Sequence, residues 1–144
     1  MTTPRFQFQA LPDWRLRITE GSRWERILPI EPVEELTVTG EKHDHVPLFT
    51  EEKWRAGTRF SRLIADECSI SHVLAPDSVR IIREDGTRLR NGIDFLVDPV
   101  WGAFGRMEDS AFGENDTVDV SYCWTPLRLD SIVRRKDGSI VQKK

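Results

Sequence analysis

Residues 117–124 read Thr-Val-Asp-Val-Ser-Tyr-Cys-Trp and decide the fold class of this chain. Within them Val118, Val120, Tyr122 and Trp124 recur at every second position, and polar or small residues stand between them. Because the side chains of a strand alternate between its two faces, this pattern predicts a β-strand with one face in a core.

Turn signals surround this strand on both sides. Asp85-Gly86, Asn91-Gly92 and Asp137-Gly138 are Asx-Gly pairs flanked by apolar or alternating residues, which is a strong short-range hairpin signal. Shorter alternating stretches fill the first half of the chain, and we expect a turn at Thr39-Gly40-Glu41. The expected strands are residues 6–8, 14–18, 24–30, 36–38, 78–83, 87–90, 94–98, 101–104, 117–124, 127–134 and 139–141.

This series of short strands predicts an all-β fold, an antiparallel β-sandwich of the jelly-roll or Ig-like kind with at most one short helix. A single helical turn is predicted at residues 50–54, with Thr50 as its N-cap. Residues 59–74 leave two alternatives open. The spacing of Phe60, Leu63, Ile64 and Cys68 favours a short amphipathic helix, whereas residues 69–73 favour short strands.

The length and net charge of the chain limit its domain organisation and the classes of function open to it. At 144 residues we expect one β-sandwich domain spanning residues 1–144, which is either complete or a fragment of a longer chain. A net charge of −3 argues against a nucleic-acid platform, which is normally basic. No apolar stretch is long enough to span a membrane, and residues 1–20 lack the apolar region of a signal peptide.

The sequence leaves the location in the cell open: the protein either stays inside the cell, or it is exported by a signal in an upstream segment that is missing from this chain. Cys68 and Cys123 match no CxxC pattern, so one disulfide and two free thiols are both open. A domain of this size needs no disulfide for its stability, which favours the two free thiols.

The second half of the chain carries a family resemblance over about residues 76–141. Gly92-Ile93-Asp94-Phe95, then Val97-Asp98, then Val118 to Tyr122, then residues 128–133 and Asp137-Gly138 together form the pattern. It is similar to the β-rich segment that precedes the catalytic domain in some bacterial SGNH (GDSL-type) hydrolases, and to assorted phage-like and surface β-modules. The resemblance implies an accessory module and a hydrolase domain that follows residue 144 in a longer parent chain.

Catalytic residues of such a hydrolase are not expected in this chain itself. The stretch Gly113-Glu114-Asn115-Asp116 matches one block of the hydrolase by letter, but there is no Gly-Asp-Ser block and no histidine follows an aspartate at the required spacing. Because the stretch directly precedes a strand, we interpret it as a turn. We therefore expect a non-catalytic domain that needs no cofactor and that positions or extends the substrate-facing surface of its hydrolase partner.

Two other groups of polar residues have a metal-site or catalytic interpretation. His43 and His45 would share one face of an extended segment, which makes them the candidates for metal ligands, although a solvent-facing loop is the favoured interpretation. Asp94 and Asp98 would lie roughly a dozen ångströms apart along a strand, too far for a glycosidase pair, so we expect both to cap turns. Asp130 is expected to pair with an arginine of the next strand.

Five tryptophans raise the hypothesis of carbohydrate binding, because sugars stack on exposed aromatic faces. In that alternative function Trp14, Trp24 and Trp54 would line one sheet face, whereas the favoured interpretation is that they pack in or over a core. A second alternative is a self-associating structural module that joins copies through exposed strand edges.

Overall fold

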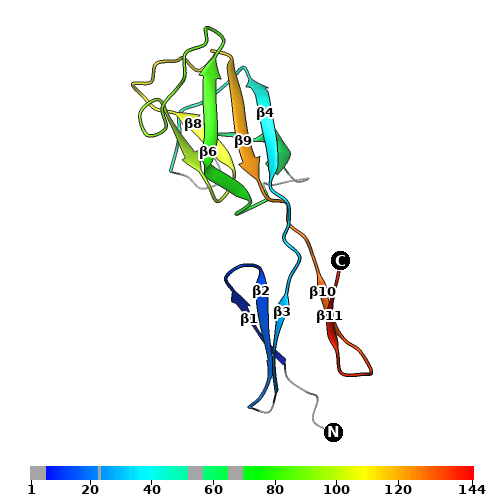
Figure 1. The fold of residues 1–144 in the computed structure, drawn as a ribbon. Coiled ribbons are helices and arrows are strands. Elements are labelled where there is room, and N and C mark those ends of the chain that lie inside the picture. Colours follow the sequence, from blue (N-terminus) through cyan, green and yellow to red (C-terminus); the bar gives the residue numbers. More distant parts are fainter. Residues whose placement is uncertain (1–5, 23, 52–56, 65–69) are drawn as a thin grey trace. The chain divides into compact units, whose positions relative to one another are not determined.

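The computed structural model describes residues 6–22, 24–51, 57–64 and 70–144. The fold is all-β, as the sequence predicts, with several antiparallel sheets and one 3₁₀ turn in the described part. Internal contacts divide the chain into two compact units (Figure 1): unit 1 comprises Met1–Val33 and Leu127–Lys144, and unit 2 comprises Glu34–Pro126. Within the described ranges, no helix has the length and apolar character that a membrane crossing requires.

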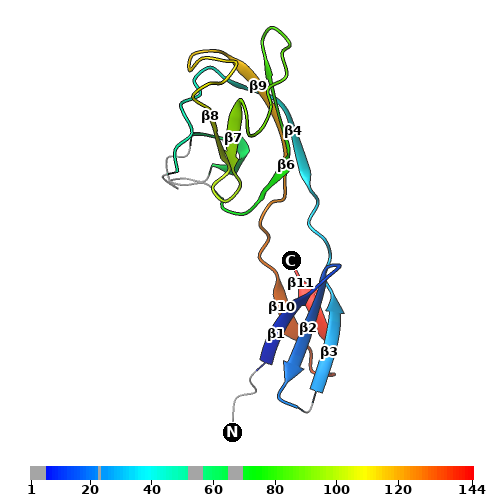
Figure 2. The same ribbon diagram turned by 90° about the vertical axis from the view of Figure 1, so that its left-hand side faces the viewer.

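Unit 2 is a sandwich of two three-stranded sheets (Figure 2). One sheet has the order β4-β9-β6 and the other the order β5-β8-β7, with all neighbours antiparallel. The 3₁₀ turn η1 (Ser61–Leu63) follows β5. The strands are β4 (Leu36–His43), β5 (Thr58–Arg59), β6 (Leu74–Arg83), β7 (Phe95–Asp98), β8 (Ala103–Arg106) and β9 (Val118–Trp124).

The core of unit 2 lies between these two sheets. Val118, Val120 and Tyr122 of the central strand β9 are buried, which confirms the predicted inward face. The ring of Phe60 lies 4.6 Å from that of Tyr122 and 5.2 Å from that of Phe104 on β8, measured between centroids, so it joins the two layers. Apolar residues from both sheets form one buried cluster around this contact.

The predicted turn at Thr39-Gly40-Glu41 is wrong, because β4 continues through it. The pairing with β9 shifts its register between Val38 and Glu41, which marks a β-bulge. Gly40 has a φ of 66° there, a conformation that glycine adopts without strain. Since the bulge adds one residue, the alternation reverses after it, and Glu41 and His43 lie on the same face of the sheet as Val38.

Unit 1 consists of two smaller sheets in two layers (Figure 2). The three-stranded sheet has the order β1-β2-β3, with β1 (Phe6–Leu11), β2 (Arg15–Glu20) and β3 (Trp24–Pro29). The second layer is the predicted hairpin of β10 (Ser131–Arg134) and β11 (Ile140–Lys143). Arg134 connects the layers, because its guanidinium carbon lies 5.8 Å from the ring centroid of Trp24 and 6.0 Å from that of Phe6.

The Asx-Gly turns are present where the sequence predicts them. Gly86, Gly92 and Gly138 all have positive φ, between 80° and 85°. The return strand predicted after Asp85-Gly86 is reduced to a single bridge between Ile82 and Arg88. Of the two alternatives for residues 59–74, the short strands at residues 69–73 are wrong in the described residues 70–73, because residues 71 and 72 form a turn ahead of β6. For the helix alternative the described residues form only the 3₁₀ turn η1, and residues 65–69 lie outside the described ranges. Of the helical turn predicted at residues 50–54, residues 52–54 also lie outside the described ranges.

The sequence leads to an expectation of one domain, whereas the contacts form two units. The chain passes between the units twice, next to Pro32 and at Pro126. Prolines of this kind also stand in ordinary turns, so the sequence pattern contains no separate signal for the boundary.

Candidate functional site

A polar cluster lies against the inner face of β4 in unit 2, at the point where the bulge has reversed the alternation. We call it the Glu41 cluster, and its members come from four elements: Glu41 and His43 of β4, Thr58 of β5, Ser61 of η1 and Tyr122 of β9. The side chains of Glu41 and His43 are about nine-tenths buried. Burial of this kind requires that every polar atom finds a partner within the protein.

Glu41 is the centre of these hydrogen bonds. Its Oε1 lies 2.6 Å from His43 Nε2 and accepts the backbone N–H of Ser61 at 2.9 Å. Its Oε2 accepts the hydroxyl of Tyr122 at 2.8 Å, and that hydroxyl oxygen accepts the backbone N–H of Arg62 at 3.2 Å. The carboxylate therefore ties η1 to two strands of the neighbouring sheet.

The pKa of Glu41 and of Tyr122 move in opposite directions for a shared reason. Burial opposes the charged carboxylate, but the hydrogen bonds from Ser61, Tyr122 and His43 outweigh it and lower the pKa of Glu41. Burial raises the pKa of the Tyr122 hydroxyl, and the adjacent Glu41 carboxylate raises it further. At neutral pH the pair is a carboxylate with a protonated phenol as its donor.

Thr58, His43 and Glu41 stand in the order hydroxyl, imidazole, carboxylate, which is the order used by nucleophilic catalysts. The Thr58 Oγ1 lies 3.5 Å from His43 Nδ1, which is longer than the hydrogen bond that activates a nucleophile. The ring of His43 packs edge-on against Phe104, with centroids 5.1 Å apart. Through Thr58 of β5 and Phe104 of β8, His43 therefore connects β4 to the second sheet of unit 2.

The tryptophans predicted to bind sugar lie apart from one another. Trp14 is in the turn between β1 and β2, is 47% exposed and has a positive φ. Trp24 begins β3 at the opposite end of the same sheet, since it pairs with Glu20, and its ring contacts Phe6 at 6.2 Å. Trp54 lies outside the described residues. Trp14 and Trp24 therefore do not form a row.

The side chains of the two candidate metal ligands have different surroundings. His43 ends β4 and is buried in the Glu41 cluster. His45 follows the bend at Asp44 and is exposed, with its Nε2 3.5 Å from Glu114. No group of three or more histidines, cysteines or acidic residues comes together to hold a metal among the described residues.

The carboxylates of the second half stabilise turns, as the sequence predicts for Asp94 and Asp98. Asp94 is buried and accepts the backbone N–H groups of Arg90 and Ala111, which outweigh burial and lower its pKa. Asp98 accepts the backbone N–H groups that follow it at Val100 and Trp101.

The stretch Gly113-Glu114-Asn115-Asp116 is a turn, as expected. Asp116 accepts the backbone N–H of Gly113 through its carboxylate, and its own backbone N–H donates to the Gly113 carbonyl. These hydrogen bonds enclose the turn residues Glu114 and Asn115.

Asp130 pairs with Arg128, two residues before it, and the expected partner on the next strand is wrong. The same carboxylate accepts the side-chain amide of Gln142 on β11 at 2.6 Å, and Arg128 donates to the carbonyl of Glu31. A short-range pair is possible because residues 128 and 130 lie on the same side of an extended segment. These bonds join the end of β3 to the β10-β11 hairpin within unit 1.

Cys123 on β9 is a free, half-buried thiol, 3.4 Å from the hydroxyl of Thr37. Cys68 lies outside the described residues.

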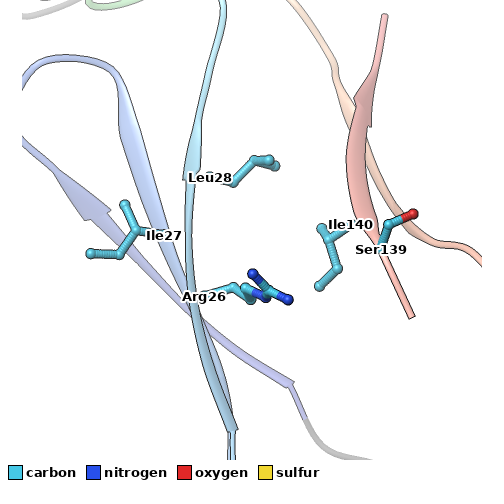
Figure 3. Close-up of a pocket in the computed structure, with 5 residues that line it drawn as sticks. All are labelled: Arg26, Ile27, Leu28, Ser139 and Ile140. Carbon is cyan, nitrogen blue, oxygen red and sulfur yellow. The ribbon is translucent and has the colours of Figure 1, made fainter. Parts of the chain in front are cut away.

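A hollow opens in unit 1 between β3 and β11 (Figure 3). In the close-up, Arg26 and Leu28 point from β3 toward Ile140 of β11, while Ile27 points away. Ser139 completes the lining. The lining therefore combines the cationic side chain of Arg26 with aliphatic side chains.

Sequence reasoning missed Glu41, Thr58 and Tyr122 as members of one site. The available signal is Gly40, since a glycine inside an alternating stretch can mark a bulge that changes which residues face inward. The hollow has a weaker signal in Pro29, a residue confined to edge positions in strands. Comparison of the chain with protein-family models, curated proteins and solved structures finds no match.

Proposed function

We propose that this chain is a non-catalytic accessory module, and that its unit 1 packs against a hydrolase domain of SGNH type in a longer parent chain. The module would position that domain or extend its substrate-facing surface. The difference in burial between the two units is the observation that supports this proposal, and the sequence resemblance supplies the identity of the partner.

Unit 2 buries a full apolar core, whereas unit 1 does not. Ile18 is the one buried apolar residue in the described part of unit 1, and all the other buried apolar residues belong to unit 2. Phe8 and Ile27 are 57% and 47% exposed on the strands of unit 1. The two side chains lie on opposite faces of the sheet, because Phe8 is in register with Ile18 and Ile18 with Arg26, the neighbour of Ile27. Because a folding unit of about fifty residues is marginal when its core is small, a partner surface that covers either side chain would stabilise unit 1.

The buried polar groups of unit 2 also fit a scaffold. Glu41, Asp94 and Tyr122 direct their hydrogen bonds to backbone groups and side chains of the same unit. Groups used in this way hold loops and strands in place.

The test compares the parent chain with a version that lacks residues 1–144. We expect hydrolysis of a small soluble ester such as p-nitrophenyl acetate to be retained without the module, whereas hydrolysis of a bulky or polymeric ester falls. If the parent chain and the version without the module hydrolyse the bulky ester at equal rates, the proposal is contradicted. Residues 1–144 alone should not hydrolyse the small ester, and hydrolysis that disappears in His43→Ala would mean that the Glu41 cluster is catalytic.

Carbohydrate binding is a second proposal, favoured by the exposure of Trp14 at the tip of a hairpin. An exposed indole at such a tip presents a face on which a sugar ring can stack. Tryptophan fluorescence should then shift with added xylo- or chito-oligosaccharide. The shift should vanish in Trp14→Ala and persist in Trp101→Phe, and no shift with either sugar would contradict it.

A further inference from the structure

Strand β1 forms one edge of the three-stranded sheet in unit 1, and β3 forms the other (Figure 2). β1 pairs with β2, and no residue in the described ranges pairs with its other side. Residues 7–10 of this strand are all exposed. An open edge carries backbone N–H and C=O groups that can pair with another extended chain.

The edge of β1 lacks the features that usually discourage such pairing. Edge strands are commonly protected by charged side chains, prolines or bulges. Every other edge strand that the structure describes carries at least one charged side chain: β3, β4, β5, β6, β7, β10 and β11. β1 reads Phe-Gln-Phe-Gln-Ala-Leu, with neither a charge nor a proline, and its register with β2 is continuous.

The two faces of β1 differ in chemistry. Phe8 shares its face with Ile18, the buried residue opposite it on β2. Gln7 and Gln9 lie on the other face, because side chains alternate along a strand. The side-chain oxygen of Gln9 accepts a hydrogen bond from Arg17 at 2.9 Å, so its amide NH₂ group remains as a donor.

A second copy of β1 matches this edge. A twofold axis perpendicular to the sheet pairs two copies of one strand antiparallel and keeps like faces on the same side. With the axis at Phe8, the two Phe8 side chains stand opposite each other, and Gln7 of each copy stands opposite Gln9 of the other. Amide side chains both donate and accept hydrogen bonds, and opposed aromatic side chains stabilise a strand pair.

We propose that two copies of this chain associate through antiparallel pairing of their β1 strands, with the two Phe8 side chains opposite each other at the twofold axis. A second copy is favoured over a charged partner strand, because β1 offers no charge with which such a strand could pair. The apolar row of Ile18 and Phe8 then continues into the second copy and enlarges the small core of unit 1. The face that carries Ile27 stays uncovered, so the pairing does not depend on the accessory role.

Sedimentation velocity of the full chain, from micromolar to millimolar concentration, tests this pairing. We expect an equilibrium between monomer and dimer. Phe8→Lys places two like charges at the axis and should raise the dissociation constant of the dimer about tenfold or more. Phe8→Glu should do the same. An equimolar mixture of the two variants should associate again, because opposite charges then face each other, and this recovery requires that both variants fold.

The matched control is Ile27→Lys, which adds a charge at an exposed position on the other face and the other edge strand of the same sheet. It should dimerise as the unaltered chain does. The proposal is overturned if the unaltered chain stays monomeric at millimolar concentration, or if Phe8→Lys dimerises as tightly as the unaltered chain. It is also overturned if the mixture of the two Phe8 variants stays monomeric, or if Ile27→Lys weakens the dimer equally.

Discussion

The Glu41 carboxylate stabilises unit 2 only in its charged form, because all of its partners in the cluster are hydrogen-bond donors or a histidine ring. It accepts hydrogen bonds from Ser61 and Tyr122 and lies beside His43. Its lowered pKa expresses the same fact, since the fold favours the carboxylate over the acid.

Glu41→Gln should lower the free energy of unfolding by about 1–3 kcal/mol, because a charged acceptor is replaced by a neutral amide with one oxygen. Urea unfolding at pH 7 measures the change. Glu35→Gln is the matched control, since Glu35 is exposed and no bond of its side chain appears among the described residues. A loss of equal size in both variants would contradict the role of the cluster.

The same variant should change the acid sensitivity of the protein. A carboxyl whose pKa is lowered by folding contributes stability above its ordinary value near 4.5, and this contribution is lost as the pH falls below that value toward the pKa of the folded state. The difference in stability between the unaltered chain and Glu41→Gln should therefore shrink when urea unfolding is repeated at progressively lower pH. A difference that stays constant from pH 7 to pH 3 would refute the linkage.

Asp94 performs a similar task for the loop that precedes β9. Its carboxylate accepts the backbone N–H groups of Arg90 and Ala111, which lie on different segments. Asp94→Asn should lower the urea midpoint, at a cost of about 1–3 kcal/mol. Asp109→Asn in the same loop is exposed and should leave the midpoint in place. Identical midpoints for the two variants would exclude this role.

At this scale the sequence predicts local bonds better than distant ones. Asp98 bonds to residues two and three positions away, and a turn interpretation follows from its neighbours. Glu41 and Tyr122 are 81 residues apart, and no local pattern brings them together. Only the register of β4 with β9, including its bulge, determines that contact.

Among the elements, the bulge in β4 has the largest effect on the candidate site. Without the extra residue, the alternation from Val38 would turn Glu41 and His43 outward. The sequence predicts β9 and the Asx-Gly hairpin of β10 and β11 correctly, because period-two alternation and turn residues are local properties. It predicts a turn at the bulge, because a glycine between polar residues is common to both structures.

Gly40→Val should cost about 1–2 kcal/mol, since a β-branched residue is strained at a φ of 66°. The measurement is the urea midpoint, with the amide signals of residues 41–43 as a local readout. Gly113→Ala is the control, because the added carbon would meet nothing closer than 3.8 Å. Unchanged stability and unchanged signals in Gly40→Val would show that the bulge does not constrain this site.

For the whole molecule, the central feature is the unequal cores of its two units. Unit 2 buries apolar residues from both of its sheets, whereas Ile18 is the buried apolar residue in the described part of unit 1. The sequence shows strands of similar quality in both halves of the chain, so it predicts the fold class but not this division. Burial depends on which strands pack face to face. In unit 1 the strands β10 and β11, from the C-terminal end of the chain, combine with the N-terminal strands β1, β2 and β3.

Hydrogen exchange of the full chain, read by mass spectrometry, tests this claim most directly. Amides of β2 should exchange about a hundredfold faster than those of β9, which corresponds to about 3 kcal/mol between the opening of unit 1 and that of unit 2. Ile18→Ala should speed exchange in the strands of unit 1 and leave β9 unchanged, whereas Val120→Ala, the matched control, should speed exchange in β9 and leave β2 unchanged. Exchange of β2 and β9 in one common step, accelerated equally by either variant, would contradict the account.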